Sequence, residues 1–150
     1  MDKQPSVYTI GFAQKPLRTF VELLQQGGVT KLVDIRLNNT SQLAGYAKKD
    51  DLAYIMKLVG VTYAHELDLA PTPDIFEDIQ KKRIPWNDFE ARFLDLLHKR
   101  KVEERFGELL GDDTICFLCS EHKPHHCHRR LIAEYLQQNG GQEIGIVHLF

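Results

Sequence analysis

Residues 114–138 constrain the fold of this chain more than any other stretch. Residues 114–119 are β-branched or apolar and predict a buried strand, which a polar loop follows at residues 120–126. An amphipathic helix is predicted to begin at Cys127. All three cysteines and four of the seven histidines of the chain fall in this stretch. A strand that ends in a thiol and leads to such a helix indicates a reactive or anion-binding site.

Strands and helices alternate along the rest of the chain. The predicted strands are residues 7–10, 31–36, 61–65, 114–119 and 144–149. One helix is predicted after Pro16, and a second after Asp50, which would be its N-cap. Residues 74–110 are predicted to be rich in helix, with a break at residues 84–86. Residues 37–48 are interpreted as a loop. The alternation predicts one α/β domain over residues 1–150, with three α/β/α layers and a mostly parallel sheet of about five strands.

The composition is that of an ordinary globular protein and narrows the possible classes. Apolar residues make up 43% of the 150 residues and charged residues 27%. The net charge of −2 does not favour a dedicated nucleic-acid-binding protein, although a local basic patch is compatible with it. No apolar run approaches the roughly 20 residues of a membrane-spanning helix. Three cysteines, an odd number, argue against a disulfide framework and predict a cytoplasmic protein.

Polar or small residues lie at, or directly after, the carboxyl ends of four of the predicted strands. Ligands of parallel α/β sheets bind beyond the carboxyl ends of the strands, which lie at one edge. We therefore expect one pocket edge to carry Gly11, Asp34, Arg36, His65, Cys119 and Glu121.

The start of the predicted helix at Cys127 indicates an anion site. Unpaired backbone N–H groups and the helix dipole favour an anion there, and Arg129 can add a two-pronged contact to phosphate or carboxylate. The same field would make Cys127 more thiolate-like. The alternative is structural: Cys127 packs under the loop while Arg129 pairs with Asp34 or Glu121.

Cys119 stands at the end of its strand, where catalytic nucleophiles often lie. His65 or His128 could act as its base, and Glu121 could orient that base. The alternative is a buried strand cysteine, as we interpret Cys116. A cysteine phosphatase is not predicted, because its loop needs an arginine six positions after the cysteine, where this chain has a histidine. A rhodanese-like sulfur carrier is not predicted either, because the sequence identifies no compact ring of backbone donors.

Asp34 and Arg36 form a second candidate pair. Side chains two positions apart on a strand point to the same face, so both can reach one pocket. Asp34 could hold a ribose hydroxyl or act as a base, and Arg36 could hold an anion. The alternative is a salt bridge between them, or one that includes Arg129. Gly11 would allow a ligand to approach the backbone closely.

Metal binding and a disulfide are two further possibilities for the cysteines. Zinc-type ligands are offered by Cys119, Cys127 and His128, together with His122, His125 or His126. The two thiols lie eight positions apart without a Cys-x-x-Cys pair, so we predict no metal site. A reversible disulfide between Cys119 and Cys127 is compatible with their places in the chain. We expect Trp86, Phe89 and Phe93 to belong to the core.

These motifs resemble the domain-of-unknown-function family 488. The matching segments are residues 8–12 (YTIGF), 32–36 (LVDIR), 63–67 (YAHEL), 118–121 (LCSE) and 127–129 (CHR). Phe12 stands where the family usually has histidine, and residues 68–72 replace a glycine-rich stretch, so the resemblance implies a pocket shaped differently from that of many members. The resemblance implies an α/β fold and two characteristic cysteines, and it implies no established activity and no cofactor.

The sequence therefore predicts a cytoplasmic protein with a polar pocket for a small anionic or nucleotide-like ligand. Arg36 and Arg129 would hold the anion, and Cys119 or Cys127 would supply thiol chemistry. Glu121, Asp34 or His65 would move protons. The rival hypothesis is a non-catalytic module that binds nucleic acid or a protein partner and whose cysteines are structural. The sequence predicts no membrane association and leaves open the cofactor, the oligomeric state and whether the protein is an enzyme.

Overall fold

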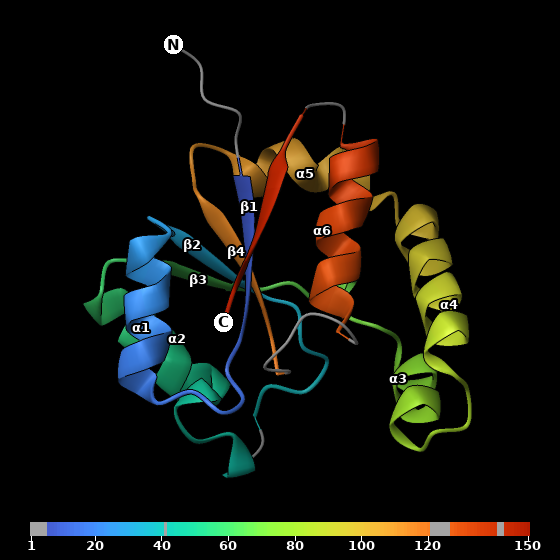
Figure 1. The fold of residues 1–150 in the computed structure, drawn as a ribbon, viewed down its shortest axis with the longest axis horizontal. Helices are drawn as coiled ribbons and strands as arrows, with labels where there is room; N and C mark the ends of the chain where they lie inside the picture. The colour runs from blue at the N-terminus through green and yellow to red at the C-terminus, as the bar shows by residue number, and fades with distance from the viewer. Residues whose placement is uncertain (1–5, 41, 121–126, 141–142) are drawn as a thin grey trace.

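A parallel sheet forms the centre of the molecule. The computed structural model describes residues 6–40, 42–120, 127–140 and 143–150. Five strands of these residues pair in the order β3 (Thr62–His65), β2 (Lys31–Asp34), β4 (Ile115–Cys119), β1 (Ser6–Gly11) and β5 (Gly145–Leu149). Every pairing is parallel. All strands therefore end at the same edge, which lies towards the bottom of Figure 1.

Helices cover both faces of this sheet (Figure 1). One face carries α1 (Leu17–Gln26) and α2 (Lys49–Leu58). The opposite side carries α3 (Pro73–Gln80), α4 (Trp86–Lys99), α5 (Val102–Leu110) and α6 (His128–Asn139). The predicted three-layer α/β/α fold with a parallel sheet of five strands is confirmed.

The burial pattern of strand β4 shows that helices cover both faces of the sheet at its centre. All five of its residues are buried. Cys116 and Leu118 pack into the core under α1 and α2, whereas Ile115, Phe117 and Cys119 pack into the core on the α6 side. A central parallel strand reads as a continuous apolar run because neither face meets water. The alternation also directs the thiol of Cys119, and not that of Cys116, towards α6.

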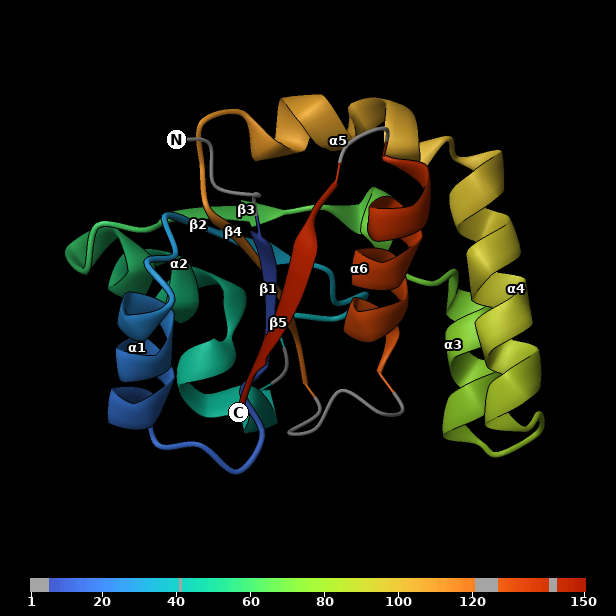
Figure 2. The ribbon, with the colours of Figure 1, turned by 45° about the horizontal axis from the view of Figure 1, so that its top comes forward.

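The helices α3 and α4 lie farther from the sheet than α6 does (Figure 2). Phe93 of α4 is fully buried, and its ring meets the ring of His128 edge-on at 5.4 Å. The stacked rings of Phe89 and Phe93 continue this contact along α4. The α6 helix is therefore enclosed between the sheet and α4, which fixes the position of its first turn.

Two local predictions differ from the structure. Residues 37–48 do not form a loop throughout, because a 3₁₀ helix, η1, occupies Gln42–Ala47. The N-cap of α2 is Lys48, and Asp50 lies in its first turn. A capping side chain is not needed there, because the Lys49 N–H donates to the carbonyl oxygen of Asn39 at 2.7 Å. A second short 3₁₀ helix, η2, follows β3 at Leu67–Leu69.

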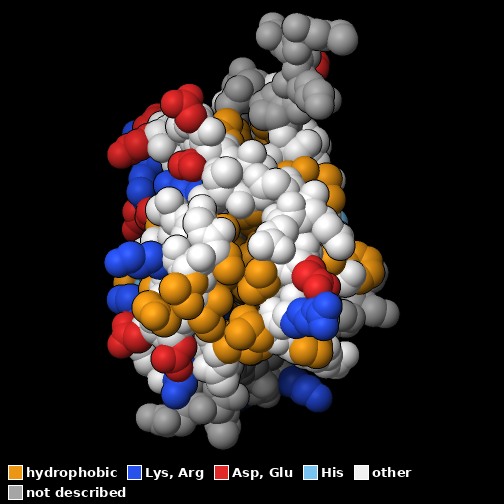
Figure 3. Space-filling view, turned by 90° about the vertical axis from the view of Figure 1, so that its left-hand side faces the viewer, with side chains coloured by type: hydrophobic (Ala, Val, Ile, Leu, Met, Phe, Trp, Pro, Cys, Tyr) orange, Lys and Arg blue, Asp and Glu red, His pale blue; other side chains and the backbone are white. Residues whose placement is uncertain are grey.

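Exposed hydrophobic side chains gather on the face that α1 and α2 present to solvent (Figure 3). The large hydrophobic residues exposed on these helices are Leu17, Tyr54 and Leu58. Among the described residues, no helix combines the length and the apolar character that crossing a bilayer requires.

A close approach at Gly140 predicts that α6 is docked tightly against α5. A Cβ atom on Gly140 would lie 2.5 Å from the carbonyl oxygen of Leu136 and 2.9 Å from the ring of Phe106. We expect Gly140→Ala to lower the free energy of unfolding by about 1–3 kcal/mol in urea denaturation, because the added methyl group overpacks this junction.

The matched control is Gly107→Ala in α5, where a Cβ atom would meet nothing within 4 Å. This change should raise the free energy of unfolding by about 0.5–1 kcal/mol, because alanine favours a helix over glycine. Equal effects of the two substitutions would contradict the docked position of Gly140.

Candidate functional site

The register of the sheet brings the predicted residues to one edge. Gly11 lies beside Cys119, and Asp34 lies beside His65. Asp34 also pairs with Leu118, so the ends of four strands meet at nearly the same level. Gly11, Asp34, His65 and Cys119 therefore lie at the carboxyl edge of the sheet, and their role as site residues stays a prediction.

A pocket of about 290 Å³ opens beyond this edge. The sheet side contributes Cys119 and Ser120, and the segment after β2 contributes residues 36–38. Cys127, the N-cap of α6, and His128, its first residue, complete the floor. The opposite wall comes from α3 and α4 and consists of Phe76, Ile79, Gln80, Trp86 and Phe89.

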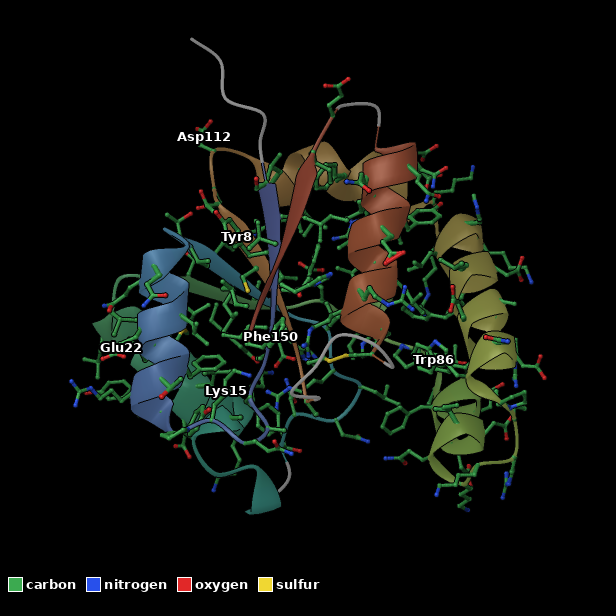
Figure 4. All side chains as sticks on the ribbon, in the orientation of Figure 1. Tyr8, Lys15, Glu22, Trp86, Asp112 and Phe150 are labelled. Atoms are coloured by element: carbon green, nitrogen blue, oxygen red, sulfur yellow. A yellow bond between two sulfur atoms is a disulfide. The ribbon has the colours of Figure 1, made fainter. Side chains whose placement is uncertain are left out.

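The two cysteines at the floor are in direct contact. The Sγ atoms of Cys119 and Cys127 are joined in a disulfide, drawn as a yellow bond in Figure 4, and their Cα atoms lie 7.4 Å apart. Both side chains are buried. Cys116 is a free thiol on the other face of β4, where burial raises its pKa. The structure therefore separates one inert core thiol from a pair that shares a site.

Arg129 is fully buried beside this pair. Its Nη1 atom lies 3.5 Å from the Sγ of Cys119 and 3.8 Å from the Sγ of Cys127. A guanidinium at this distance favours the thiolate form of a reduced cysteine. Lys15, buried in the segment after β1, has its pKa lowered first by burial and then by the charge of Arg129. The charge of Arg129 therefore lies next to both sulfur atoms.

His128 is held in one tautomer. Its Nε2 lies 2.7 Å from the carbonyl oxygen of Ile35, and a carbonyl can only accept, so Nε2 carries the proton. Burial lowers the pKa of His128 to about 4, although the hydrogen bond to Ile35 opposes this shift. The imidazole is neutral near pH 7, and its Nδ1 atom retains the lone pair.

Asp34 and Arg36 form a buried ion pair. Arg36 Nε donates to Oδ1 of Asp34 at 2.9 Å, and Nη2 donates to Oδ2 at 2.8 Å. The carboxylate also accepts the hydroxyl of Tyr63 and, at 3.3 Å, the side-chain amide of Asn39. Burial alone would raise the pKa of Asp34, but the hydrogen bonds and charge of Arg36, with the Tyr63 hydroxyl, lower it overall.

The remaining contacts of Arg36 tie it to neighbouring segments. Its Nη2 also donates to the carbonyl oxygen of Ala47 at 2.7 Å, and its guanidinium lies 5.2 Å from the ring centroid of Phe12. Phe12 thus has a packing role at the position where the family usually has histidine. The salt-bridge alternative for Asp34 and Arg36 agrees with this geometry, and Arg36 nevertheless lines the pocket.

Four predicted site residues do not line the pocket among the residues that the structure describes: Gly11, Asp34, His65 and Arg129. His65 is half-buried, and its Nε2 lies 2.8 Å from the carbonyl oxygen of Arg36, to which it donates. Gly11 is buried within the sheet edge. Glu121, with the histidines at residues 122, 125 and 126, lies outside the described residues.

Sequence reasoning missed the aromatic wall of the pocket. Phe89 and Phe93 are core residues as expected, and Trp86 packs against them. Trp86 is only half-buried, however, and Trp86 and Phe89 both face the cavity. Figure 4 shows Trp86 at the start of α4, on the same side as the disulfide. One sequence signal could have revealed that Trp86 faces a cavity: it follows Pro85 directly and therefore stands at the start of a helix instead of within one.

The buried ion pair predicts a specific pH dependence of stability. Asp34→Asn should lower the free energy of unfolding at neutral pH by about 3–5 kcal/mol, because it leaves Arg36 without its carboxylate. The folded-state pKa of Asp34 is lowered, so its stabilisation is complete above the pKa of an unfolded aspartate and is lost as the pH falls through the folded value. The difference between wild type and variant should therefore shrink in acid, as urea denaturation at several pH values will show.

The matched control is Glu77→Gln, which removes an exposed ion pair with Lys81. It should cost less than about 1 kcal/mol at any pH. A similar small loss for Asp34→Asn would show that the ion pair does not stabilise the edge of the sheet.

Comparison with known proteins found a match to a family model. Among curated proteins and among solved structures, no match to the chain was found. A family model matches residues 16–136, which include α1, the Asp34–Arg36 pair, the pocket wall and most of α6. This match covers most of the chain, and the chain therefore belongs to the family described as Domain of unknown function DUF488.

Proposed function

We propose that this protein binds a small, anionic, nucleotide-like ligand in the pocket at the carboxyl edge of the sheet, with Cys119 and Cys127 as its reactive groups. The observation that carries the proposal is the pocket itself, which joins an aromatic wall, a helix start and two sulfur atoms in one cavity of about 290 Å³. This volume suits a small molecule more than a macromolecular segment.

The aromatic wall supports a planar group on the ligand. The rings of Trp86 and Phe89 stack with centroids 4.9 Å apart and planes inclined by 28°. Trp86 is half-buried, so part of its surface remains accessible in the pocket. A base or a similar ring that covers this surface gains about 1–3 kcal/mol by stacking.

The floor supports an anionic group. Cys127 is the N-cap of α6, a helix of 12 residues, and it makes no side-chain capping hydrogen bond. The N–H groups of the first turn and the helix dipole favour an anion at this position. Arg36 adds positive charge at the pocket wall, although Asp34 offsets much of it.

Thiol chemistry is supported by the groups around the sulfur atoms. In the reducing cytoplasm that we propose for this protein, both cysteines would be thiols. Arg129 would favour their thiolate form, and the Nδ1 atom of neutral His128 could accept a proton. These groups supply a nucleophile and a base next to a bound ligand.

The only tryptophan of the chain provides a direct test, because Trp86 lines the pocket. Its fluorescence should change saturably when the reduced protein is titrated with nucleoside mono- and diphosphates. The matched nucleosides should bind at least about tenfold more weakly, since they lack the anion. Inorganic phosphate should not quench the fluorescence of Trp86.

Trp86→Leu should lower the affinity for the same nucleotides by about 5- to 150-fold in calorimetric titration, which corresponds to the loss of one stacking partner. Tyr54→Leu is the matched control, because Tyr54 is 62% exposed on α2 and should leave affinity unchanged. A panel in which no nucleotide changes the fluorescence or the unfolding temperature would contradict the proposal. A gel shift with nucleic acid in the same preparation would instead favour a non-catalytic binding module.

A further inference from the structure

Three potential metal ligands meet at the floor of the pocket. They are Cys119, Cys127 and His128, and one ligand atom from each lies within 4.8 Å of the others. The spacing of the cysteines in the sequence argued against a metal site, because eight positions separate them without a Cys-x-x-Cys pair. The fold removes this objection, since β4 and α6 bring both thiols to the same point.

We propose that the reduced protein binds one zinc-type divalent ion through Cys119, Cys127 and His128, with a further coordination position facing the pocket. Two thiolates and an imidazole are ligands that zinc prefers. Sites with three protein ligands and an open fourth position are typical of catalytic zinc, whereas structural zinc sites are closed by four. The proposal does not depend on the identity of the ligand that occupies the pocket.

The backbone positions of the cysteines suit a bridging ion. Their Cα atoms lie 7.4 Å apart, beyond the roughly 4.4–6.8 Å usual for a disulfide. Zn–S bonds of about 2.3 Å at a tetrahedral centre place two sulfurs about 3.8 Å apart. Rotation of the two side chains in the reduced protein can provide this separation without moving β4 or α6.

The surroundings of the imidazole are those of a metal-binding histidine. Metal-ligating histidines usually donate their second ring N–H to a carboxylate or a backbone carbonyl, which fixes the orientation of the ring. His128 makes this contact from Nε2 to the carbonyl oxygen of Ile35 at 2.7 Å. Nδ1 is then the nitrogen that carries the lone pair. The edge-on contact with Phe93 further restricts rotation of the ring.

Arg129 supports two thiolates at one buried point. Its Nη1 atom lies 3.5 and 3.8 Å from the two sulfur atoms, so it can donate to them while they coordinate an ion. Hydrogen bonds to coordinating sulfur offset part of the negative charge that burial would otherwise penalise. With an ion bound, the two thiolates act as ligands, so the thiol chemistry proposed above belongs to the reduced, metal-free protein.

Oxidation and metal binding exclude one another at this site. The sulfur atoms of the disulfide between Cys119 and Cys127 are neutral and are poor ligands, whereas the ion needs two thiolates. Diamide converts the two thiols to the disulfide and is itself reduced to its hydrazine by the two electrons and two protons that they lose. The disulfide form of the same polypeptide is therefore a built-in negative control.

Cobalt titration tests the proposal on unmodified wild-type protein. Protein purified without a histidine tag, reduced and freed of metal with a chelator, is titrated with Co²⁺. We expect one equivalent to bind, with a near-ultraviolet thiolate-to-cobalt charge-transfer band and the intense visible bands of a tetrahedral centre. Zn²⁺ should displace the cobalt and abolish both signals. The absence of a charge-transfer band in the reduced protein would overturn the proposal, because this readout needs no variant to fold.

Variants then assign the ligands. Cys119→Ala and Cys127→Ala should each abolish the charge-transfer band or halve it, and His128→Gln should weaken binding at least about tenfold. Cys116→Ala removes the thiol on the other face of β4 and should leave the titration unchanged. Oxidised wild type should bind no cobalt. Equal binding by the Cys119→Ala, Cys127→Ala double variant would place the ion elsewhere and overturn the proposal.

Discussion

The buried ion pair between Asp34 and Arg36 is the interaction on which the carboxyl edge of the sheet depends. An isolated charge costs several kcal/mol to bury, so each partner needs the other and the surrounding hydrogen bonds. Tyr63 from β3 and Asn39 before η1 complete the shell of the carboxylate, and Ala47 and Phe12 complete that of the guanidinium. Four segments are thus held at fixed positions around one polar centre, which shapes one side of the pocket.

The strands and their shared edge could be predicted because they depend on local patterns. The apolar run of β4 predicts a buried parallel strand, and both its burial and its parallel register with β1 agree. The pocket wall could not be predicted in this way. The position of Trp86 over the floor depends on how α4 packs against α6, and these helices are far apart in the sequence. No local pattern reports such a contact.

The chemistry of the site could likewise be predicted only where it depends on local sequence patterns. The residue types at the helix start of α6 indicated an anion site or a thiol site, and both hypotheses remain compatible with the geometry. The fixed tautomer of His128 could not be predicted, because its partner is the carbonyl oxygen of Ile35, which sequence patterns do not locate. The helix cap at Asp50 was wrong for a related reason: a distant backbone carbonyl, that of Asn39, supplies the acceptor that a capping side chain would otherwise provide.

The pocket draws its two sides from different layers of the molecule. Its floor belongs to the sheet edge and to the first turn of α6, whereas its aromatic wall belongs to the outer pair of helices, α3 and α4. Substitutions in the outer pair can therefore reshape the cavity while the buried floor keeps its structure. The shape of the cavity could diverge among relatives while its floor is retained, because the wall and the floor are encoded in separate parts of the chain.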